Sequence, residues 1–361
     1  MKPPFRADQV GSLLRPRELA EARAKFKKHE LSSGDLKSLE DGCIREAIRK
    51  QESVGLQAVT DGEMRRDWWH LDFMTQLDGV TAIVNPGPKF GGTEEQPPIP
   101  SVTGKVGCSK PIMVQDFAFL KQNAGQTAKF TIPSPTMLHL RGGRSSISKQ
   151  VYPDLAEFWA DTAAAYRKAI RHLADAGCTY LQLDDVSFSY LCDPKIRETA
   201  RKNGDDPAKL PRTYADAVSE ALRDRPAGMT VTMHTCRGNF KSSWVASGGY
   251  ETVAEAMFSS GVDAFFMEFD DQRSGGFEPL RYLPKDKKVV LGLVTTKVGK
   301  LESRDELKKR IDDAARFVPL ENLCLSPQCG FSSTHHGNSL SADEQWRKLE
   351  RVVEVAREVW R

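Results

Sequence analysis

Eight short apolar runs rich in β-branched and aromatic residues recur along this 361-residue chain, and helical patterns separate most of them. The runs are Phe5–Ser12, Gln57–Asp61, Lys129–Pro133, Tyr180–Asp184, Thr230–His234, Ala264–Glu268, Val289–Thr295 and Leu323–Ser326. Strands that alternate with helices pair in parallel, because each helix carries the chain back to the end where the strand began. This alternation restricts the chain to an α/β fold with a parallel sheet.

Amphipathic helices are predicted between these strands. Apolar residues recur at helical spacing in 155–176 and 342–360, and Ser303 with Glu306 forms a capping-box pattern at the start of a helix over 303–317. Eight strand–helix units predict a closed barrel rather than an open sheet. We therefore expect a single (β/α)8 TIM barrel over residues 1–361, since barrels of this length form one domain.

One stretch departs from the barrel pattern. Residues 78–107 are rich in Gly and Pro, and the flanks Val80–Val84 and Ser101–Val106 alternate as the arms of a hairpin do. We interpret the stretch as a hairpin insertion after the second strand, which serves either as a lid or as decoration.

The composition excludes several classes of protein. Hydrophobic residues make up 39% and charged residues 28% of the chain, as in globular proteins, and the formal net charge is only +3. So small a surplus predicts neither a nucleic-acid partner nor a membrane partner. The N-terminus lacks an apolar signal segment, so we expect a cytoplasmic protein whose seven scattered cysteines are reduced thiols or metal ligands.

Three late strands end in side chains that bind soft metal ions. His234 and Cys236 lie two residues apart at the end of the fifth strand and so share a face, Glu268 ends the sixth strand, and Cys329 follows the eighth. The ends of barrel strands meet at one rim, which brings these distant residues together. An imidazole, two thiolates and a carboxylate favour Zn²⁺.

Each of these residues also has an ordinary interpretation. A single His at a strand end is more often a rim residue than a ligand, Cys is commonly a small buried hydrophobe, and Glu268 suits an ion pair. The other five cysteines fit that interpretation: Cys43, Cys108, Cys178, Cys192 and Cys324. The convergence of three segments at one rim is what favours a metal site.

Carboxylates end two earlier strands, at Asp184-Asp185 and at Glu63. Such rim carboxylates suit ammonium binding or proton transfer, which makes Asp184 the candidate catalytic residue. Asp185 equally suits the N-cap of a helix. Val10-Gly11-Ser12 ends the first strand, where the glycine permits close approach to the backbone and the serine offers a hydroxyl group; a simple tight turn is the alternative.

Two further clusters lie beyond strand ends. Arg65-Arg66-Asp67-Trp68-Trp69-His70 offers charge and aromatic rings that suit a flat or anionic ligand, although a helix start with aromatics in the core explains it as well. His335-His336 follows Cys329 and lies either at the site or on an exposed loop.

These motifs resemble the catalytic domain of cobalamin-independent methionine synthase, and most of all its short 5-methyltetrahydropteroyltriglutamate–homocysteine methyltransferase-like relatives. The similarity runs from Phe5 to the final helix. It implies a TIM barrel of the type in methionine synthase and uroporphyrinogen decarboxylase. The implied zinc ligands are His234, Cys236, Glu268 and Cys329. The implied contacts of the amino-acid part of homocysteine are Val10, Ser12, Glu63 and Asp184.

The chain departs from the family pattern in the features that bind the methyl donor and relay its proton. Full-length enzymes of this type carry a second, N-terminal barrel that helps to bind polyglutamyl folate, and we expect this chain to lack it. Leu293-Val294-Thr295-Thr296-Lys297 stands where the family has an Asp-x-His relay, and Asp184-Asp185-Val186 replaces Asp-Glu-Pro. We therefore expect slow use of polyglutamyl methyltetrahydrofolate, with a corrinoid as the alternative donor.

Three functions stay open on the sequence. The first is methylation of homocysteine to methionine, in which zinc deprotonates the thiol that it binds. The second is another zinc-dependent thiol alkyltransferase, such as a coenzyme M methyl- or epoxyalkane-transferase, for which Arg65, Arg66, Arg237 and Lys297 offer a cationic clamp. The third is a uroporphyrinogen-decarboxylase-like lyase or a metal-free barrel. Neither of these would give His234, Cys236 and Cys329 a function. The sequence leaves the oligomeric state open.

Overall fold

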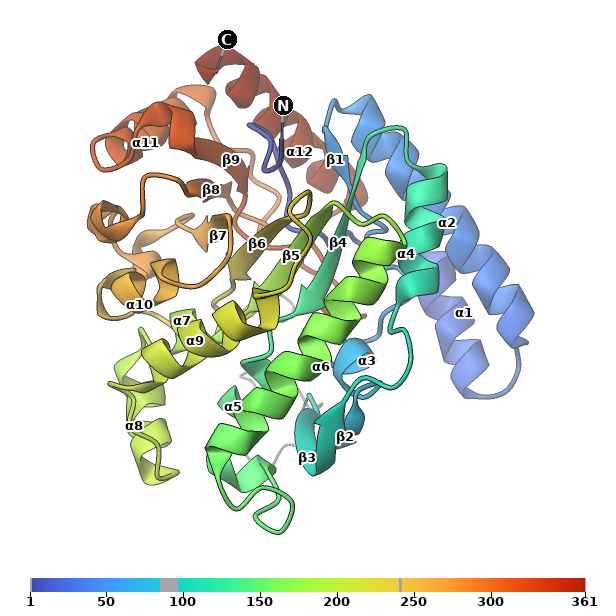
Figure 1. The fold of residues 1–361 in the computed structure, drawn as a ribbon. Coiled ribbons are helices and arrows are strands. Elements are labelled where there is room, and N and C mark those ends of the chain that lie inside the picture. Colours follow the sequence, from blue (N-terminus) through green and yellow to red (C-terminus); the bar gives the residue numbers. More distant parts are fainter. Residues whose placement is uncertain (1, 85–96, 240–241, 361) are drawn as a thin grey trace.

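The parallel sheet predicted from the alternation is present in the computed structural model, which describes residues 2–84, 97–239 and 242–360 (Figure 1). Within these residues, seven parallel strands form a curled sheet in the order β1-β4-β5-β6-β7-β8-β9. Their bounds are β1 (Ala58–Val59), β4 (Thr127–Pro133), β5 (Tyr180–Asp185), β6 (Thr230–Thr235), β7 (Ala264–Glu268), β8 (Lys288–Val294) and β9 (Leu323–Pro327).

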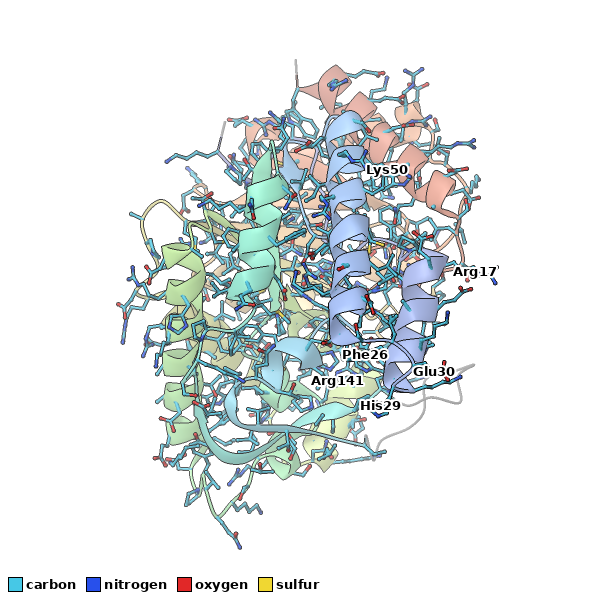
Figure 2. All side chains as sticks on the ribbon, turned by 90° about the vertical axis from the view of Figure 1, so that its right-hand side faces the viewer. Arg17, Phe26, His29, Glu30, Lys50 and Arg141 are labelled. Atoms are coloured by element: carbon cyan, nitrogen blue, oxygen red, sulfur yellow. The ribbon has the colours of Figure 1, made fainter. Side chains whose placement is uncertain are left out.

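Helices connect these strands and cover the outer face of the sheet. They are α1 (Arg17–Lys27), α2 (Ser33–Ser53), α3 (Leu71–Met74), α4 (Val114–Asn123), α5 (Met137–Leu140), α6 (Leu155–Asp175), α7 (Ser187–Tyr190), α8 (Pro194–Lys202), α9 (Leu210–Leu222), α10 (Ala254–Phe258), α11 (Arg304–Ala315) and α12 (Ala342–Val359). The three predicted helices correspond to α6, α11 and α12, while α1 and α2 lie side by side on the outside (Figure 2). No helix of the described residues is long and apolar enough to cross a membrane.

The first predicted strand is not regular. Residues 5–12 form a single parallel bridge, Ala7 with Leu325, so a complete eight-stranded barrel is not confirmed. The carboxylate of Asp8 accepts the backbone N–H groups of Phe5 and Gln9 at 3.2 and 2.8 Å. Such local bonds compete with strand pairing, because they use the donors that a ladder needs.

The segment is nevertheless held between the two edges of the sheet. The backbone N–H of Asp8 donates to the carbonyl of Leu325 on β9 at 3.0 Å. At the other edge, the N–H of Leu13 donates to the carbonyl of Gly62 at 3.1 Å, just beyond β1. Residues 5–12 therefore occupy the gap between β9 and β1.

The predicted hairpin insertion is present. Strand β2 (Asp78–Ile83) pairs antiparallel with β3 (Ile99–Gly107). Gly79 has a φ of 73°, and a Cβ atom there would lie 2.4 Å from the carbonyl oxygen of Lys105, so only glycine fits this crossing. The Gly- and Pro-rich middle of the insertion, residues 85–96, lies outside the described residues.

A fully buried ion pair ties the start of the chain to the interior of the sheet. Lys129 Nζ on β4 donates to Asp8 Oδ1 at 3.1 Å, and the hydroxyl of Tyr180 on β5 donates to Asp8 Oδ2 at 2.8 Å. Neither charged side chain is exposed, and Nζ lies 3.9 Å from the ring centroid of Phe266. Removal of one partner from such a pair leaves an uncompensated buried charge.

We predict that Lys129→Met lowers the free energy of unfolding by about 3–5 kcal/mol, because it leaves the buried Asp8 carboxylate without a positively charged partner. Chemical denaturation followed by circular dichroism measures the change. Glu21→Ala, which breaks the exposed Arg17–Glu21 pair on α1, is the control and should cost less than about 1 kcal/mol. Equal losses in the two variants would contradict the role of the buried pair.

Candidate metal centre

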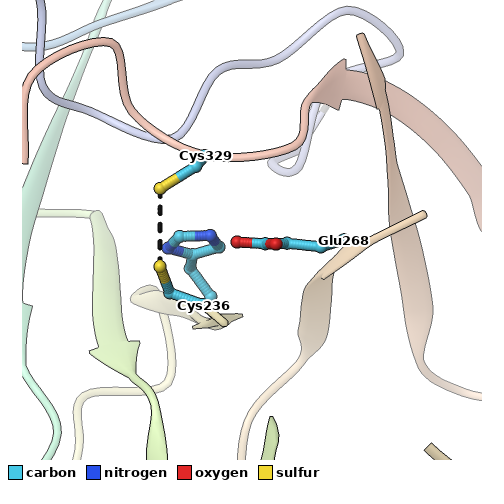
Figure 3. A group of neighbouring side chains, drawn as sticks. Cys236, Glu268 and Cys329 are labelled. Atoms are coloured by element: carbon cyan, nitrogen blue, oxygen red, sulfur yellow. Dashed lines mark hydrogen bonds between the residues drawn. The ribbon is translucent and has the colours of Figure 1, made fainter. Parts of the chain in front are cut away.

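Four side chains with metal-binding atoms converge at the carboxyl end of the sheet (Figure 3). One ligand atom from each of His234, Cys236, Glu268 and Cys329 lies within 4.8 Å of the others, and all four residues are buried. The two sulfur atoms are 3.5 Å apart, and every cysteine of the chain is a free thiol. The structure thus brings together the four residues that the sequence singled out, and their binding of a metal ion stays a prediction.

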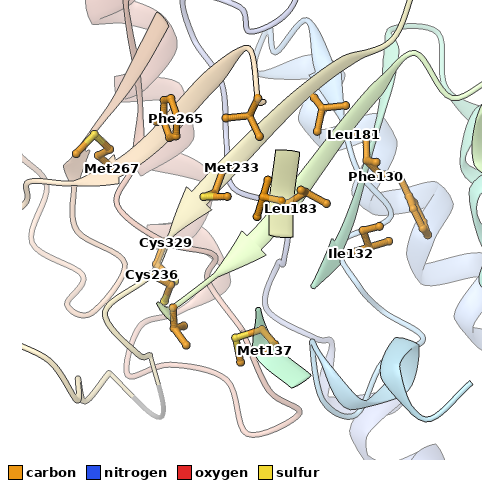
Figure 4. Packing of buried hydrophobic residues seen from close by; sticks show 14 of the residues in the cluster. Phe130, Ile132, Met137, Leu181, Leu183, Met233, Cys236, Phe265, Met267 and Cys329 are labelled. Atoms are coloured by element: carbon orange, nitrogen blue, oxygen red, sulfur yellow. The ribbon is translucent and has the colours of Figure 1, made fainter. Parts of the chain in front are cut away.

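The alternation of side chains along the strands explains this convergence. His234 on β6 and Glu268 on β7 point to the inside of the curled sheet, whereas their neighbours Met233 and Met267 pack in the apolar core under the helices (Figure 4). Cys236 follows β6 directly and extends its pairing, since its N–H donates to the carbonyl of Asp185 at 2.7 Å. Three of the ligands therefore come from the adjacent ends of β6 and β7, and the fourth, Cys329, follows β9.

Asp184 holds the imidazole of His234 in place. Its Oδ1 lies 3.4 Å from His234 Nδ1 and accepts a hydrogen bond of 2.7 Å from Gln182 Nε2. The same amide donates to the carbonyl of Val10 at 2.6 Å, which ties residues 5–12 to the site. The other ring nitrogen, Nε2, lies 3.2 Å from the backbone carbonyl oxygen of Gln328, so both ring nitrogens face oxygen atoms in the cluster. This orienting contact was not predicted from the sequence.

Positive groups surround the carboxylate of Glu268. Its Oε1 accepts the backbone N–H of Arg237 at 3.1 Å, and its Oε2 accepts from the Arg273 guanidinium at 3.3 Å. Lys297 is 6% exposed, and its Nζ has no hydrogen-bond partner among the described residues. Burial raises the pKa of Glu268, and the charge of Lys297 opposes that rise. The pKa of Glu268 is nevertheless raised overall, so these groups offset only part of the cost of burying its charge.

Protons are shared unevenly within the cluster. Burial opposes a charge on His234, but hydrogen bonds to Asp184 and Cys329 raise its pKa to about 10. A hydrogen bond from Cys236 lowers the pKa of Cys329 well below its usual range, against the effect of burial, and the pKa of Cys236 is raised by the same bond. Without a cation the cluster therefore favours an imidazolium–thiolate pair, and metal binding would release its protons.

A pocket opens beside this cluster. Its lining includes His234, Cys236 and Cys329. It also includes all four residues predicted to bind the substrate, namely Val10, Ser12, Glu63 and Asp184. A small molecule in this pocket therefore reaches both the metal-type ligands and two carboxylates.

Glu63 sits on a tight turn after β1. Its φ of 57° is rare outside glycine, and its N–H donates to Asp61 Oδ1 at 2.9 Å. Thr131 donates to Glu63 Oε1 at 2.9 Å, whereas Oε2 has no partner among the described residues. Burial raises the pKa of Glu63 to about 7, with Arg66 opposing the rise and Asp184 adding to it. A cation bound beside this carboxyl group would displace its proton.

Gly11 allows the chain to approach this carboxylate. Its φ is 148°, and a Cβ atom there would lie 2.8 Å from Thr131 Cγ2. The neighbouring Ser12 lines the pocket, and its Oγ accepts the N–H of Ser332 at 3.3 Å. The glycine thus lets the chain pass close to Thr131, and close approach of a ligand to this backbone stays a prediction.

Other residues singled out from the sequence have structural contacts. Asp185 caps α7, since its Oδ1 accepts the N–H of Ser187 at 2.7 Å, in line with the helix-cap alternative. Trp68 and Trp69 line the pocket, but His335-His336 pack on the ring of Trp68 and line a separate cavity beside α1 and α12. One alternative placed these two histidines at the site, but they are not among the residues that line the site pocket.

Five polar residues of the pocket were not singled out from the sequence. They lie in the segments that follow β4, β5, β6 and β9, and they are Arg141, Tyr190, Asn239, Ser333 and Thr334. No periodicity marks them, and the one signal that points to them is their position shortly after strand ends, where barrel enzymes place their sites.

Comparison with known proteins agrees with this geometry. The sequence model of one family, described as the catalytic domain of cobalamin-independent synthase, matches residues 5–358. An uncharacterized Bacillus subtilis protein, YxjH, is 47% identical, with 100% of this chain and 96% of that protein covered. A methionine synthase of Saccharolobus solfataricus is 24% identical over 96% of this chain and 92% of its own length.

A solved structure is similar over the whole chain. It is that of a Listeria monocytogenes protein assigned to the vitamin-B12-independent methionine synthases, with 40% sequence identity and a TM-score of 0.82. The superposition covers 100% of this chain and 99% of that one. Sequence and fold therefore point to the same family.

We predict that Glu63→Gln stabilises the metal-free protein at pH 8 but not at pH 4.5. The folded-state pKa of Glu63 is about 7, above its ordinary 4.5, so the parent loses stability as pH rises between these values and the glutamine variant does not. The difference should reach at most about 3 kcal/mol. Urea unfolding of both proteins across this range measures it.

Glu21→Gln on exposed α1 is the control for the loss of an acid, and it should show no comparable trend with pH. A constant difference between the parent and Glu63→Gln from pH 4.5 to 8 would refute the assigned pKa.

Proposed function

This chain belongs to the family of cobalamin-independent synthase catalytic domains, and we propose that it is a zinc-dependent methyltransferase that converts homocysteine to methionine. The observation that carries the proposal is that the His234–Cys236–Cys329 face of the ligand cluster opens into a pocket with two acidic side chains. Those acids, Glu63 and Asp184, offer the negative charge that the ammonium group of an amino-acid thiol requires.

The donor set suits zinc. One imidazole, two thiols and a carboxylate match the ligands that Zn²⁺ takes in tetrahedral sites. The two sulfur atoms, 3.5 Å apart, are close enough to share one ion and are not joined as a disulfide. His234, Cys236, Cys329 and Glu268 would hold the ion. Glu268 offers the hardest donor atom of the four, and we infer that it would be the ligand most readily displaced.

Zinc at this site would supply a thiolate, because coordination deprotonates a thiol that is otherwise mostly protonated at neutral pH. The chain's own residues do the positioning. Asp184 fixes the imidazole of His234, and Arg273 with the backbone N–H of Arg237 holds the Glu268 carboxyl group in position beside the other ligands. The buried walls exclude water, so the sulfur meets the methyl group in a fixed orientation.

A methylated pteroylglutamate is the donor that the family implies. The corrinoid expected from the sequence as an alternative donor is not supported, because the family is cobalamin-independent. The end of β8 carries Thr295-Thr296-Lys297 in place of the relay imidazole, so slow use of polyglutamyl folate stays a prediction. Family membership also argues against a uroporphyrinogen-decarboxylase-like lyase.

The four cations named from the sequence do not form the clamp that a coenzyme M transferase requires. Arg65 pairs with acids on α2 and α4, and Arg66 donates to the carbonyl of Thr131. Arg237 stacks over a buried tyrosine, and Lys297 is directed to the Glu268 side. None of these four cations lines the described part of the pocket. Homocysteine is therefore the better candidate thiol.

We also infer that residues 5–12 stand in for an eighth strand and close a single-domain barrel over 1–361. Support comes from their backbone bonds to β9 and to the turn after β1, and from Gln182, which holds Val10 from inside.

We predict close to one Zn²⁺ per chain in the parent protein and at least about 100-fold weaker zinc binding in Cys236→Ala and Cys329→Ala, since even outer-shell changes cost 10–100-fold. Elemental analysis and competition with a chelator measure both quantities. Cys43→Ala, at a buried thiol outside the cluster, is the control and should retain zinc. Full zinc content in the two variants would contradict the assignment of Cys236 and Cys329 as zinc ligands.

We predict that zinc-loaded protein methylates homocysteine from a methylated folate and that Asp184→Asn keeps its zinc. The asparagine oxygen can still face His234, but the charge that attracts an ammonium group is gone. The kcat/KM for homocysteine should fall at least about tenfold more than that for 4-mercaptobutyrate, which lacks the amino group. Equal losses for the two thiols would rule out ammonium binding by Asp184.

A further inference from the structure

The side chain of Arg15, just before α1, donates hydrogen bonds to two separate segments of the chain. Its Nη1 donates to the carbonyl oxygen and the hydroxyl of Ser332 at 2.9 and 2.6 Å, and to the carbonyl of Thr334 at 3.1 Å. Its Nη2 donates to the carbonyl oxygens of Glu63 and Arg66 at 3.0 and 2.9 Å. The guanidinium therefore joins the turn after β1 to the loop after β9.

These acceptors of Arg15 are all uncharged carbonyl or hydroxyl oxygens. The nearby Arg23 instead pairs with two acids, Glu40 and Asp67, at 2.7 and 3.0 Å. Burial lowers the pKa of Arg15 to about 10, so its guanidinium stays protonated at neutral pH. Burial of a cation is costly, and the property that distinguishes this one is a planar fork whose two NH2 groups bind in fixed directions.

Both segments that Arg15 joins carry residues of the pocket beside the metal-type ligands. Glu63 lines the pocket from the turn after β1, and Ser333 and Thr334 line it from the loop after β9. The two segments also meet directly, because Trp68 and Thr334 form an antiparallel bridge. Arg15 is not among the residues that line the described part of the pocket, so any effect on a ligand there passes through these two walls.

The backbone of Glu63 requires support of this kind. Its φ of 57° is rare outside glycine, and such a conformation persists only where the surrounding structure holds it. The carbonyl of Glu63 accepts from Arg15 Nη2 and from the backbone N–H of Arg66, each at 3.0 Å. Relaxation of this turn would move the carboxylate away from the hydroxyl of Thr131, which donates to it at 2.9 Å, and away from the pocket.

We propose that Arg15 is a positioning residue, which orients the Glu63 carboxylate for the ammonium group of the amino-acid thiol. The inference rests on the proposed function and adds to it a residue outside the pocket on which substrate specificity depends. The fork is essential, because one NH2 group holds the turn of Glu63 and the other holds the loop at Ser332. Lysine retains the charge, but its single nitrogen cannot bind both segments in these directions.

The test is a double-mutant cycle between Arg15→Lys and Glu63→Gln in the zinc-loaded protein. Calorimetry gives the Kd of homocysteine and of 4-mercaptobutyrate, which lacks the amino group. Arg15→Lys should weaken homocysteine at least about fivefold in the parent but less than about twofold in the Glu63→Gln background, where the carboxylate that Arg15 orients is absent. The Kd of 4-mercaptobutyrate should change less than about twofold in either background.

Arg17→Lys is the matched control, because the side chain of Arg17 is 93% exposed at the start of α1, where it pairs with Glu21 (Figure 2). It should leave both Kd values unchanged. Arg15→Gln, which retains one NH2 group but no fork and no charge, is a second variant and should weaken homocysteine at least as much as Arg15→Lys.

Homocysteine binding that is unchanged, or equally weakened, by Arg15→Lys in the two backgrounds would overturn the role of Arg15 alone. Equal losses for the two thiols would overturn it as well, and so would the loss of a cooperative thermal transition in both Arg15 variants, which would show a purely structural role. A parent protein that binds no homocysteine overturns the proposed function and this inference with it.

Discussion

Two thiols and three carboxyl groups are buried at one end of the sheet, and the rest of the site depends on how the negative charge of their ionised forms is balanced. Isolated buried charges cost several kcal/mol each, so such a group of acids persists only with positive partners. The positive charges of Arg273 and Lys297 interact with Glu268, and that of Arg66 interacts with Glu63. The thiols have the imidazole of His234, and a divalent cation would complete the balance. The same charge balance explains why the acids open onto a pocket that suits an ammonium group.

A rigid frame holds this charged group together. The segment that carries Cys329 has no strand of its own, yet the N–H of Gln328 donates to Val294 at 2.8 Å and its Oε1 accepts the N–H of Thr296 at 2.7 Å. A Cβ atom on Gly292 would lie 2.7 Å from Gln328 Cα, so the loop packs directly on β8. Ligands fixed in this way need little reorganisation when an ion binds.

The strands and the metal-type residues were predictable because both follow local rules. A run of apolar residues predicts a buried parallel strand whatever its neighbours, and β7 begins and ends where the pattern places it, at Ala264–Glu268. Residues two apart share a face of a strand, which pairs His234 with Cys236. The first segment failed this rule, because the side chain of Asp8 takes two backbone donors that a strand would use.

The sequence alone determined the alternation of strands and helices, the hairpin insertion and the chemical types of residue at the strand ends, because periodicity and residue chemistry are properties of neighbours along the chain. Tertiary structure decided which side chains meet. The contact of Asp184 with His234 and the raised pKa of Glu63 depend on distances across the sheet and on burial. Neither the distances nor the burial can be read from the spacing of residues along the chain, since both arise only when the parallel strands bring their carboxyl ends to one rim.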